Sequence, residues 1–102
     1  MFAEFSVYPM GQVHFSKVLA EIIQEVRNSG LEYQLGPMGT SLKGHEERVF
    51  SMIQRCLDIA NKHSERVIMS ISIDNDLVND AHLSDRVNKV IGKVAMNTKE
   101  EN

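Results

Sequence analysis

The chain has 102 residues, of which 42% are hydrophobic and 25% charged, and its formal net charge is −3. This composition is typical of one globular domain and unlike that of disordered or fibrous chains. The acidic balance argues against a nucleic acid partner, and the apolar stretches are too short for a membrane span.

The cysteine content and the N-terminal residues bear on localisation. The single cysteine, Cys56, cannot form an internal disulfide, so we expect packing to stabilise the chain and its compartment to be reducing. The N-terminal residues lack the basic and then apolar layout of a secretory signal. We therefore expect a cytoplasmic protein.

The first third of the chain predicts a strand followed by a helix. Residues 2–8 alternate between apolar and polar side chains before Pro9 and Gly11, which indicates a strand with one buried face. Residues 16–29 carry apolar side chains at helical spacing, and Gly30 supplies a C-terminal stop.

The middle of the chain repeats this order after a hairpin. Residues 31–35 and 40–43 alternate on either side of the turn Gly36-Pro37-Met38-Gly39, which favours two short strands. Residues 46–60 form a second helical stripe with glutamates in the first turn, and residues 66–74 are the clearest strand.

The C-terminal part predicts a third amphipathic helix over residues 83–94 and a disordered polar tail over residues 96–102. Right-handed crossovers place the first two helices on one face of a single sheet. The sequence therefore predicts an α+β fold, a ferredoxin-like βαββαβ sandwich with an extra C-terminal helix, as one domain over residues 1–95.

The sheet face opposite these helices is expected to be polar and small-sided. Charged side chains are usual on a face left in water, whereas short hydroxyls let another layer approach closely. We expect a second subunit, rather than the third helix, to cover this face. Its residues are Glu4, Ser6, Tyr8, Gln34, Ser70, Ser72 and Asp74.

No residue pattern predicts a metal site. The four histidines show no spacing typical of zinc ligands. The run Asp74-Asn75-Asp76 with Asp80 lacks the glycine and closing glutamate of an EF-hand, and turn formation explains it better. Cys56 lies on the apolar stripe of the second helix and is expected in the core.

Two enzyme or binding classes share the expected fold. Residues 11–17 resemble the phosphate-cradling loop of acylphosphatases, but that loop uses an arginine and this segment has only Lys17. RNA recognition motifs stack bases on aromatic residues of the third strand, and Thr40-Ser41-Leu42-Lys43 contains none.

Three segments carry a family resemblance: residues 7–11, residues 28–40 with the run Ser-Gly-Leu-Glu-Tyr leading into Pro-Met-Gly-Thr, and residues 66–74. Together they resemble the single-domain thiamine-binding proteins, which are similar to each half of a two-repeat bacterial protein that binds thiamine or its hydroxymethylpyrimidine moiety. The resemblance covers residues 2–94. It implies a ferredoxin-like fold, homodimers pairing into homotetramers, and binding without catalysis or a cofactor.

A flat aminopyrimidine needs an apolar or aromatic slot with a few fixed donors and acceptors. Tyr8, Tyr33 and Met38 are candidates for the slot. The candidates for polar contacts are Ser16, Thr40, Ser70, Ser72 and Asp74, and Gly39 joins them through its place in the hairpin. Tyr33 shares a parity with core positions, and Thr40 lies beside the turn, so a structural role stays equally open for both.

The chain departs from the family pattern at Lys43, which stands where family members commonly have glutamate, so charge recognition can differ here. Family members also commonly have a basic residue near Asp76. Two alternatives to thiamine or pyrimidine binding stay open. One is an oligomerisation or regulatory module without a ligand, and the other is an acylphosphatase-like hydrolase.

Overall fold

A computed structural model describes residues 1–78, 88 and 90–94. Its elements follow the order β-α-β-β-α-β, as predicted. They are β1 (Phe2–Pro9), α1 (Phe15–Ser29), β2 (Glu32–Leu35), β3 (Thr40–Lys43), α2 (Glu46–His63) and β4 (Val67–Asp74).

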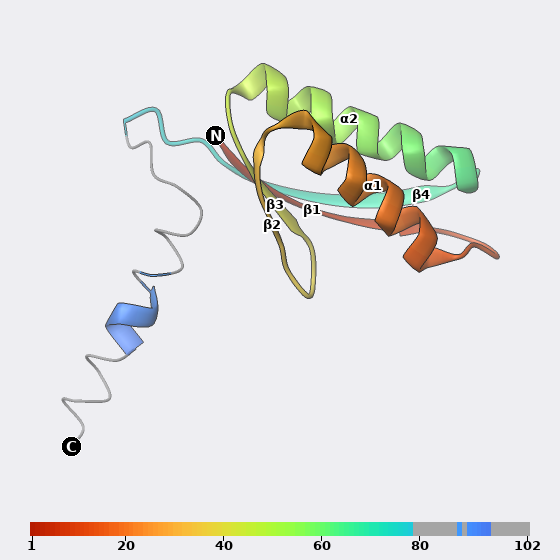
Figure 1. Cartoon of the computed structure of the whole chain (residues 1–102), viewed down its shortest axis with the longest axis horizontal. Helices are drawn as coiled ribbons and strands as arrows, with labels where there is room; N and C mark the ends of the chain where they lie inside the picture. The colour runs from red at the N-terminus through yellow and green to blue at the C-terminus, as the bar shows by residue number, and fades with distance from the viewer. Residues whose placement is uncertain (79–87, 89, 95–102) are drawn as a thin grey trace.

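The four strands form one antiparallel sheet in the order β2-β3-β1-β4, with α1 and α2 together on one face (Figure 1). This is the predicted ferredoxin-like arrangement. β1 pairs with β4 along its whole length, from Phe2 opposite Asp74 to Pro9 opposite Val67. It pairs with the shorter β3 only from Phe2 to Phe5, which lies opposite Thr40.

The helix ends follow their local sequence. Gly30 ends α1 with a φ of 79°, a left-handed conformation that a residue without Cβ adopts at little cost. α2 has Glu46 and Glu47 in its first turn and Lys62 and His63 in its last. Both placements are favourable in the field of the helix dipole.

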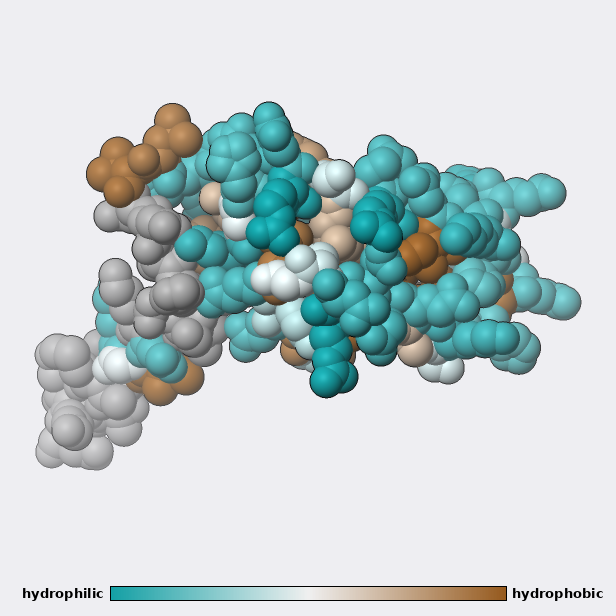
Figure 2. Space-filling view, turned by 45° about the horizontal axis from the view of Figure 1, so that its top comes forward, coloured by the Kyte–Doolittle hydropathy of each residue, from teal (hydrophilic) through white to brown (hydrophobic). Residues whose placement is uncertain are grey.

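The core lies between the sheet and the two helices. It contains the inward residues of β1 and β3 and the predicted stripes of both helices, whose outward faces are largely hydrophilic (Figure 2). The fully buried side chains are Phe5, Val18, Ile22, Val26, Leu42, Val49 and Cys56. The alternation of apolar and polar residues in the strands and the helical stripes therefore predicted the main core positions of β1, β3, α1 and α2.

Two ion pairs join the exposed sides of α1 and α2. Arg55 pairs with Glu25, and His63 Nε2 lies 2.9 Å from Glu21 Oε2. The hydrogen bond to His63 is the main cause that lowers the pKa of Glu21. Both pairs are open to solvent, so they orient the helices more than they stabilise the fold.

Ser64 is a buried polar residue that joins two loops. Its hydroxyl lies 2.6 Å from the Met10 carbonyl oxygen and 2.8 Å from that of Arg66. The Met10 N–H also donates to the Arg66 carbonyl at 2.8 Å. These bonds fix the end of β1 beside the start of β4.

Two predictions differ from the structure or lie beyond it. Ile71 and Ile73 share the helix-facing parity of β4, yet both are 45% exposed, because the core contacts of this edge strand reach only Val67 and Met69. Of the helix predicted over residues 83–94, residues 88 and 90–94 are helical. The rest of it and the predicted tail at 96–102 lie outside the described residues.

Within the described ranges, no helix has the length and hydropathy needed to cross a membrane.

Burial of Cys56 predicts slow thiol chemistry. Desolvation raises the pKa of its thiol to about 11, so the native thiol stays protonated where an unfolded one ionises. The contribution of Cys56 to stability should therefore be constant below about pH 9 and should decline as the pH rises towards about 11. Iodoacetamide should modify the native chain roughly a hundredfold more slowly than the urea-unfolded chain, the factor that two pKa units imply. Equal rates would contradict this.

Candidate functional site

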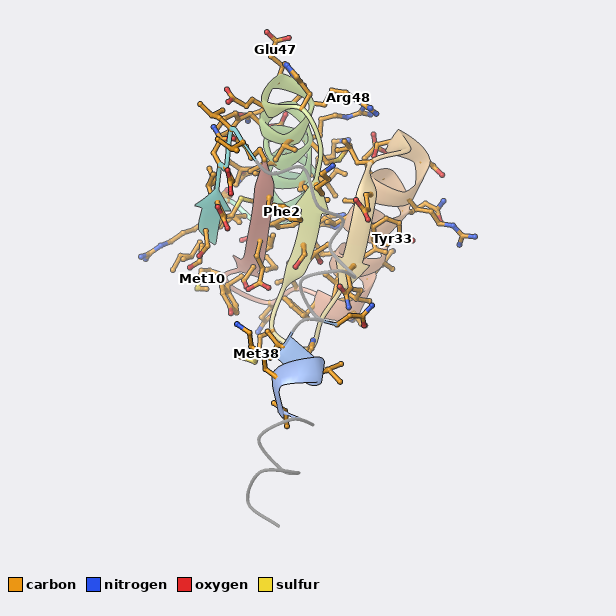
Figure 3. The ribbon with its side chains drawn as sticks, turned by 90° about the vertical axis from the view of Figure 1, so that its left-hand side faces the viewer. Phe2, Met10, Tyr33, Met38, Glu47 and Arg48 are labelled. Atoms are coloured by element: carbon orange, nitrogen blue, oxygen red, sulfur yellow. The ribbon has the colours of Figure 1, made fainter. Side chains whose placement is uncertain are left out.

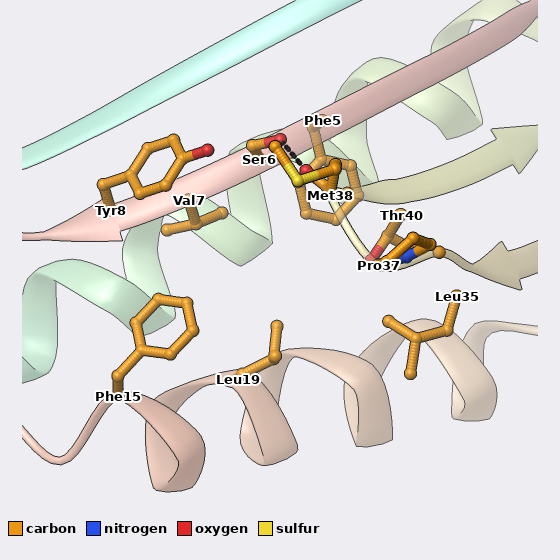
Figure 4. A pocket seen from close by; sticks show the side chains of 12 residues that line it. Phe5, Ser6, Val7, Tyr8, Phe15, Leu19, Leu35, Pro37, Met38 and Thr40 are labelled. Atoms are coloured by element: carbon orange, nitrogen blue, oxygen red, sulfur yellow. Dashed lines mark hydrogen bonds between the residues drawn. The ribbon is translucent and has the colours of Figure 1, made fainter.

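A cavity of about 300 Å³ opens beside the last residues of β1 (Figure 4). Its walls come from β1, the first turns of α1 and the loop between β2 and β3. The lining residues are Phe5, Ser6, Val7, Tyr8, Phe15, Leu19, Leu35, Gly36, Pro37, Met38, Gly39 and Thr40. The cavity exists because β3 begins opposite Phe5, so β1 continues beyond it with the loop alongside.

The β2–β3 loop, residues 36–39, is held against β1 by polar and steric contacts. The Gly36 N–H donates to the Gly39 carbonyl at 2.8 Å and closes the turn. The Ser6 hydroxyl donates to the Met38 carbonyl at 2.6 Å, which attaches the loop to β1 (Figure 4).

Gly39 lies so close to β1 that no side chain fits. A Cβ there would lie 2.9 Å from both the Phe5 carbonyl oxygen and Ser6 Oγ. These contacts are shorter than a real Cβ tolerates, so the loop adopts this position only with glycine at 39.

The walls of the cavity expose apolar surface that a ligand would cover. Phe15 is 48% exposed, Tyr8 43%, Leu35 55% and Met38 77%. Phe15 and Leu19 extend from α1 towards β1, with Val7 on the facing wall (Figure 4). Such a slot, apolar with a few polar atoms, is typical of small-molecule sites.

Thr40 is the buried polar side chain of the cavity. It is 2% exposed and lines the wall where β3 begins. Its hydroxyl makes no hydrogen bond with any other described residue, and since no enclosed side-chain polar atom among these residues lacks a partner, this oxygen keeps some exposed surface. A ligand in the cavity could therefore provide a partner that this hydroxyl otherwise lacks.

Among the residues that the structure describes, none that lines the cavity carries a charge. Glu4 precedes the cavity on β1, its side chain lies beside Gly39, and its carboxylate accepts a hydrogen bond from Ser41 at 3.3 Å. Lys43 lies at the far end of β3, opposite Phe2, and does not line the cavity.

Four of the predicted site residues meet in this cavity: Tyr8, Met38, Gly39 and Thr40. The other five lie elsewhere. Tyr33 packs against the core on the helix side of the sheet and lies apart from Met38 at the hairpin tip (Figure 3). Ser16 is exposed in the first turn of α1, and Ser70, Ser72 and Asp74 lie on the outer face of β4.

Several lining residues were not among the predicted candidates. The alternation of residues 2–8 places Ser6 on the polar sheet face and Phe5 and Val7 on the buried one, and Leu19 belongs to the apolar stripe of residues 16–29. Phe15 precedes the apolar stripe of α1, so helical periodicity does not select it. The sequence does contain one signal for Phe15: it is an aromatic residue just before the expected helix, and the apolar stripe of that helix does not require it.

A second hollow of about 290 Å³ lies at the other end of the sheet, between the N-terminus, the start of α2 and residues 75–78. There the Asn75 amide donates to Glu46 Oε1 at 2.8 Å, and the Val78 N–H donates to Asp76 Oδ1 at 2.9 Å. The second bond is that of an Asx turn, as expected for this run. No group of three metal-ligating side chains occurs among the residues described.

Comparisons with known proteins agree with the fold. A family model described as thiamine-binding protein matches residues 3–91. A domain of unknown function from Bacillus cereus is 26% identical, with a TM-score of 0.77 over 84% of this chain and 85% of that one. A hypothetical protein from Methanocaldococcus jannaschii is 25% identical, with a TM-score of 0.78 over 89% of this chain and 94% of that one.

A candidate thiamine biosynthesis or salvage protein from Thermotoga maritima is 18% identical, with a TM-score of 0.76 over 87% of this chain and 96% of that one. This last likeness concerns the fold alone. No curated protein matches the sequence.

The fit of Gly39 against β1 predicts a sensitive position. Gly39→Ala should lower the free energy of unfolding by about 1–3 kcal/mol, because the new Cβ must displace the loop or β1. Gly92→Ala is the control, since an added Cβ there meets nothing within 4 Å. Thermal unfolding of both variants measures the difference, and equal melting temperatures would show that the loop is not held as described.

Proposed function

Because the chain belongs to the thiamine-binding protein family, we propose that it binds thiamine or the related hydroxymethylpyrimidine in the cavity beside β1. The observation that carries this proposal is a slot of about 300 Å³, lined by aromatic and aliphatic side chains and without charge. Its volume is at the low end for ligand sites, which suits a single substituted ring better than a large cofactor.

The walls match the faces of a flat heterocycle. The side chains of Phe15, Leu19 and Val7 provide the apolar surface against which an aminopyrimidine would lie. The Thr40 hydroxyl supplies a donor or acceptor for a polar substituent. Five predicted residues belong to this site only if the ligand extends beyond the cavity or a second subunit brings them to it. They are Ser16, Tyr33, Ser70, Ser72 and Asp74.

Charge distinguishes the two ligands. Moving a cationic ring from water into an uncharged apolar slot is costly, whereas a neutral pyrimidine bears no such cost. The thiazolium of thiamine would therefore lie outside the slot, on the side of Glu4, whose carboxylate can attract it. We propose that the pyrimidine ring occupies the slot in both cases.

The chemistry of the lining supports binding without catalysis. Among the described lining residues, the hydroxyls are those of Ser6, Thr40 and the Tyr8 phenol, and no histidine or carboxylate is present to activate them. The Cys56 thiol is buried in the core with a raised pKa. Acetyl phosphate hydrolysis that disappears in Lys17→Ala would instead support the hydrolase alternative.

A cytoplasmic homo-oligomer is part of the proposal. β4 is an edge strand of eight residues, and Ile68, Ile71 and Ile73 along it are each 44–45% exposed. An exposed apolar edge of this length favours association with another chain. The same edge favours the second candidate function, an oligomerisation module whose assembly needs no ligand.

Binding is tested by calorimetry with thiamine and with hydroxymethylpyrimidine. Phe15→Ala should weaken binding about tenfold, because it removes one wall of the slot. Phe50→Ala is the matched control, since Phe50 is 49% exposed and Phe15 48%, yet Phe50 does not line the cavity. Absence of heat with both ligands would reject the proposal and leave the oligomerisation module.

Assembly is tested by light scattering after gel filtration. We expect a dimer or tetramer that Ile73→Lys shifts towards the monomer, because a buried lysine at the interface would lose its hydration. Leu77→Lys is the control, since Leu77 is 86% exposed beyond the end of β4. A monomeric parent protein, or equal shifts in both variants, would contradict assembly through this edge.

A further inference from the structure

The hydrogen-bond pattern of β1 shows which main-chain groups face the cavity. Met1 and Gly44 exchange two hydrogen bonds of 3.1 Å across the β1–β3 side. In an antiparallel ladder every second residue directs its N–H and C=O to the same neighbour. Ala3, Phe5 and Val7 therefore direct these groups towards β3, and Met10, which donates to Arg66, faces the β4 side.

Val7 is the first residue of this series without a strand partner. Thr40 is opposite Phe5 at the end of the β1–β3 pairing, so continuation of the ladder would place Met38 opposite Val7. The Met38 carbonyl instead accepts the hydrogen bond from the Ser6 hydroxyl. Among the described residues, the Val7 N–H and C=O have no hydrogen-bond partner, and Val7 lines the cavity.

We infer that the main-chain N–H and C=O of Val7 are the recognition edge of the site, reading an adjacent acceptor and donor on an amino-substituted nitrogen heterocycle. A ring nitrogen beside an exocyclic amino group offers this pair, and it meets one extended residue with two parallel hydrogen bonds. The inference rests on the proposed function and deepens it, because it names the atoms that select the ligand.

The opening is too short for a peptide strand. On one side the β2–β3 loop is fastened to Ser6, and on the other Pro9 has no N–H to donate. Beyond the β1–β3 pairing, Val7 is thus the one residue of β1 that directs both an N–H and a C=O towards the β3 side. A ring of pyrimidine size fills such an opening, whereas an added strand needs several consecutive pairs.

The Thr40 hydroxyl provides a second, separate contact. Thr40 is the partner of Phe5, so it lies one step along the sheet from Val7 and is buried in the same cavity. A heterocycle bonded to Val7 would direct a further substituent towards this hydroxyl. The site then reads an amino group through the main chain and a second polar group through Thr40.

The test is amide hydrogen exchange of Val7 by NMR, with saturating hydroxymethylpyrimidine as the probe. We expect the Val7 amide to exchange about tenfold more slowly in the complex, since the ligand adds a hydrogen bond. The Ala3 amide is the control within the strand, because it has the same parity and is already opposite Leu42 in the β1–β3 ladder. Its rate should not change.

A ligand analogue with a dimethylated amino group supplies the second measurement. It keeps the ring but cannot donate to the Val7 carbonyl, so we expect calorimetry to show binding weakened by about tenfold. Binding of the parent ligand with unchanged Val7 exchange, or equal affinity of the analogue, would overturn the inference and leave the proposed function standing. No binding of the parent ligand at all would overturn both.

Discussion

The unequal lengths of β1 and β3 create the cavity beside the last residues of β1. β1 has eight residues and is paired throughout by β4, whereas β3 has four and stops opposite Phe5. Extended backbone that loses one neighbour leaves polar groups unpaired on that side. Here the β2–β3 loop and α1 enclose this end of β1 without closing on it, and the cavity is the space that results.

That cavity persists only while the loop keeps its position. The Ser6 hydroxyl, in place of a β1 main-chain N–H, donates a hydrogen bond to the Met38 carbonyl. Gly39, which has no side chain, allows the loop backbone to approach the backbone of β1. Were the loop to pair with Val7 in register, the ladder would be complete and the opening lost. The hairpin therefore acts less as a source of ligand-contacting side chains than as the part that keeps β3 from extending.

The sequence predicted the fold well because the fold depends on periodic burial. Alternation and helical stripes identified every strand and both sheet-covering helices, and they placed Tyr8 and Tyr33 on opposite faces. That parity already argued against one slot containing both tyrosines. Phe15 and the unpaired Val7 could not be found in this way, because they depend on where a distant strand begins, which local pattern does not determine.

A site that recognises its ligand partly through main-chain groups changes how substitutions near it act. The N–H and C=O of Val7 do not depend on its side chain, so apolar replacements there alter packing and leave the recognition groups in place. A change in loop length or at Gly39 would shift the register of β3 and remove them. Ligand selection at this site would thus depend more on strand geometry than on residue identity. Strand geometry can be kept while the sequence changes, as the same fold at 26% sequence identity illustrates.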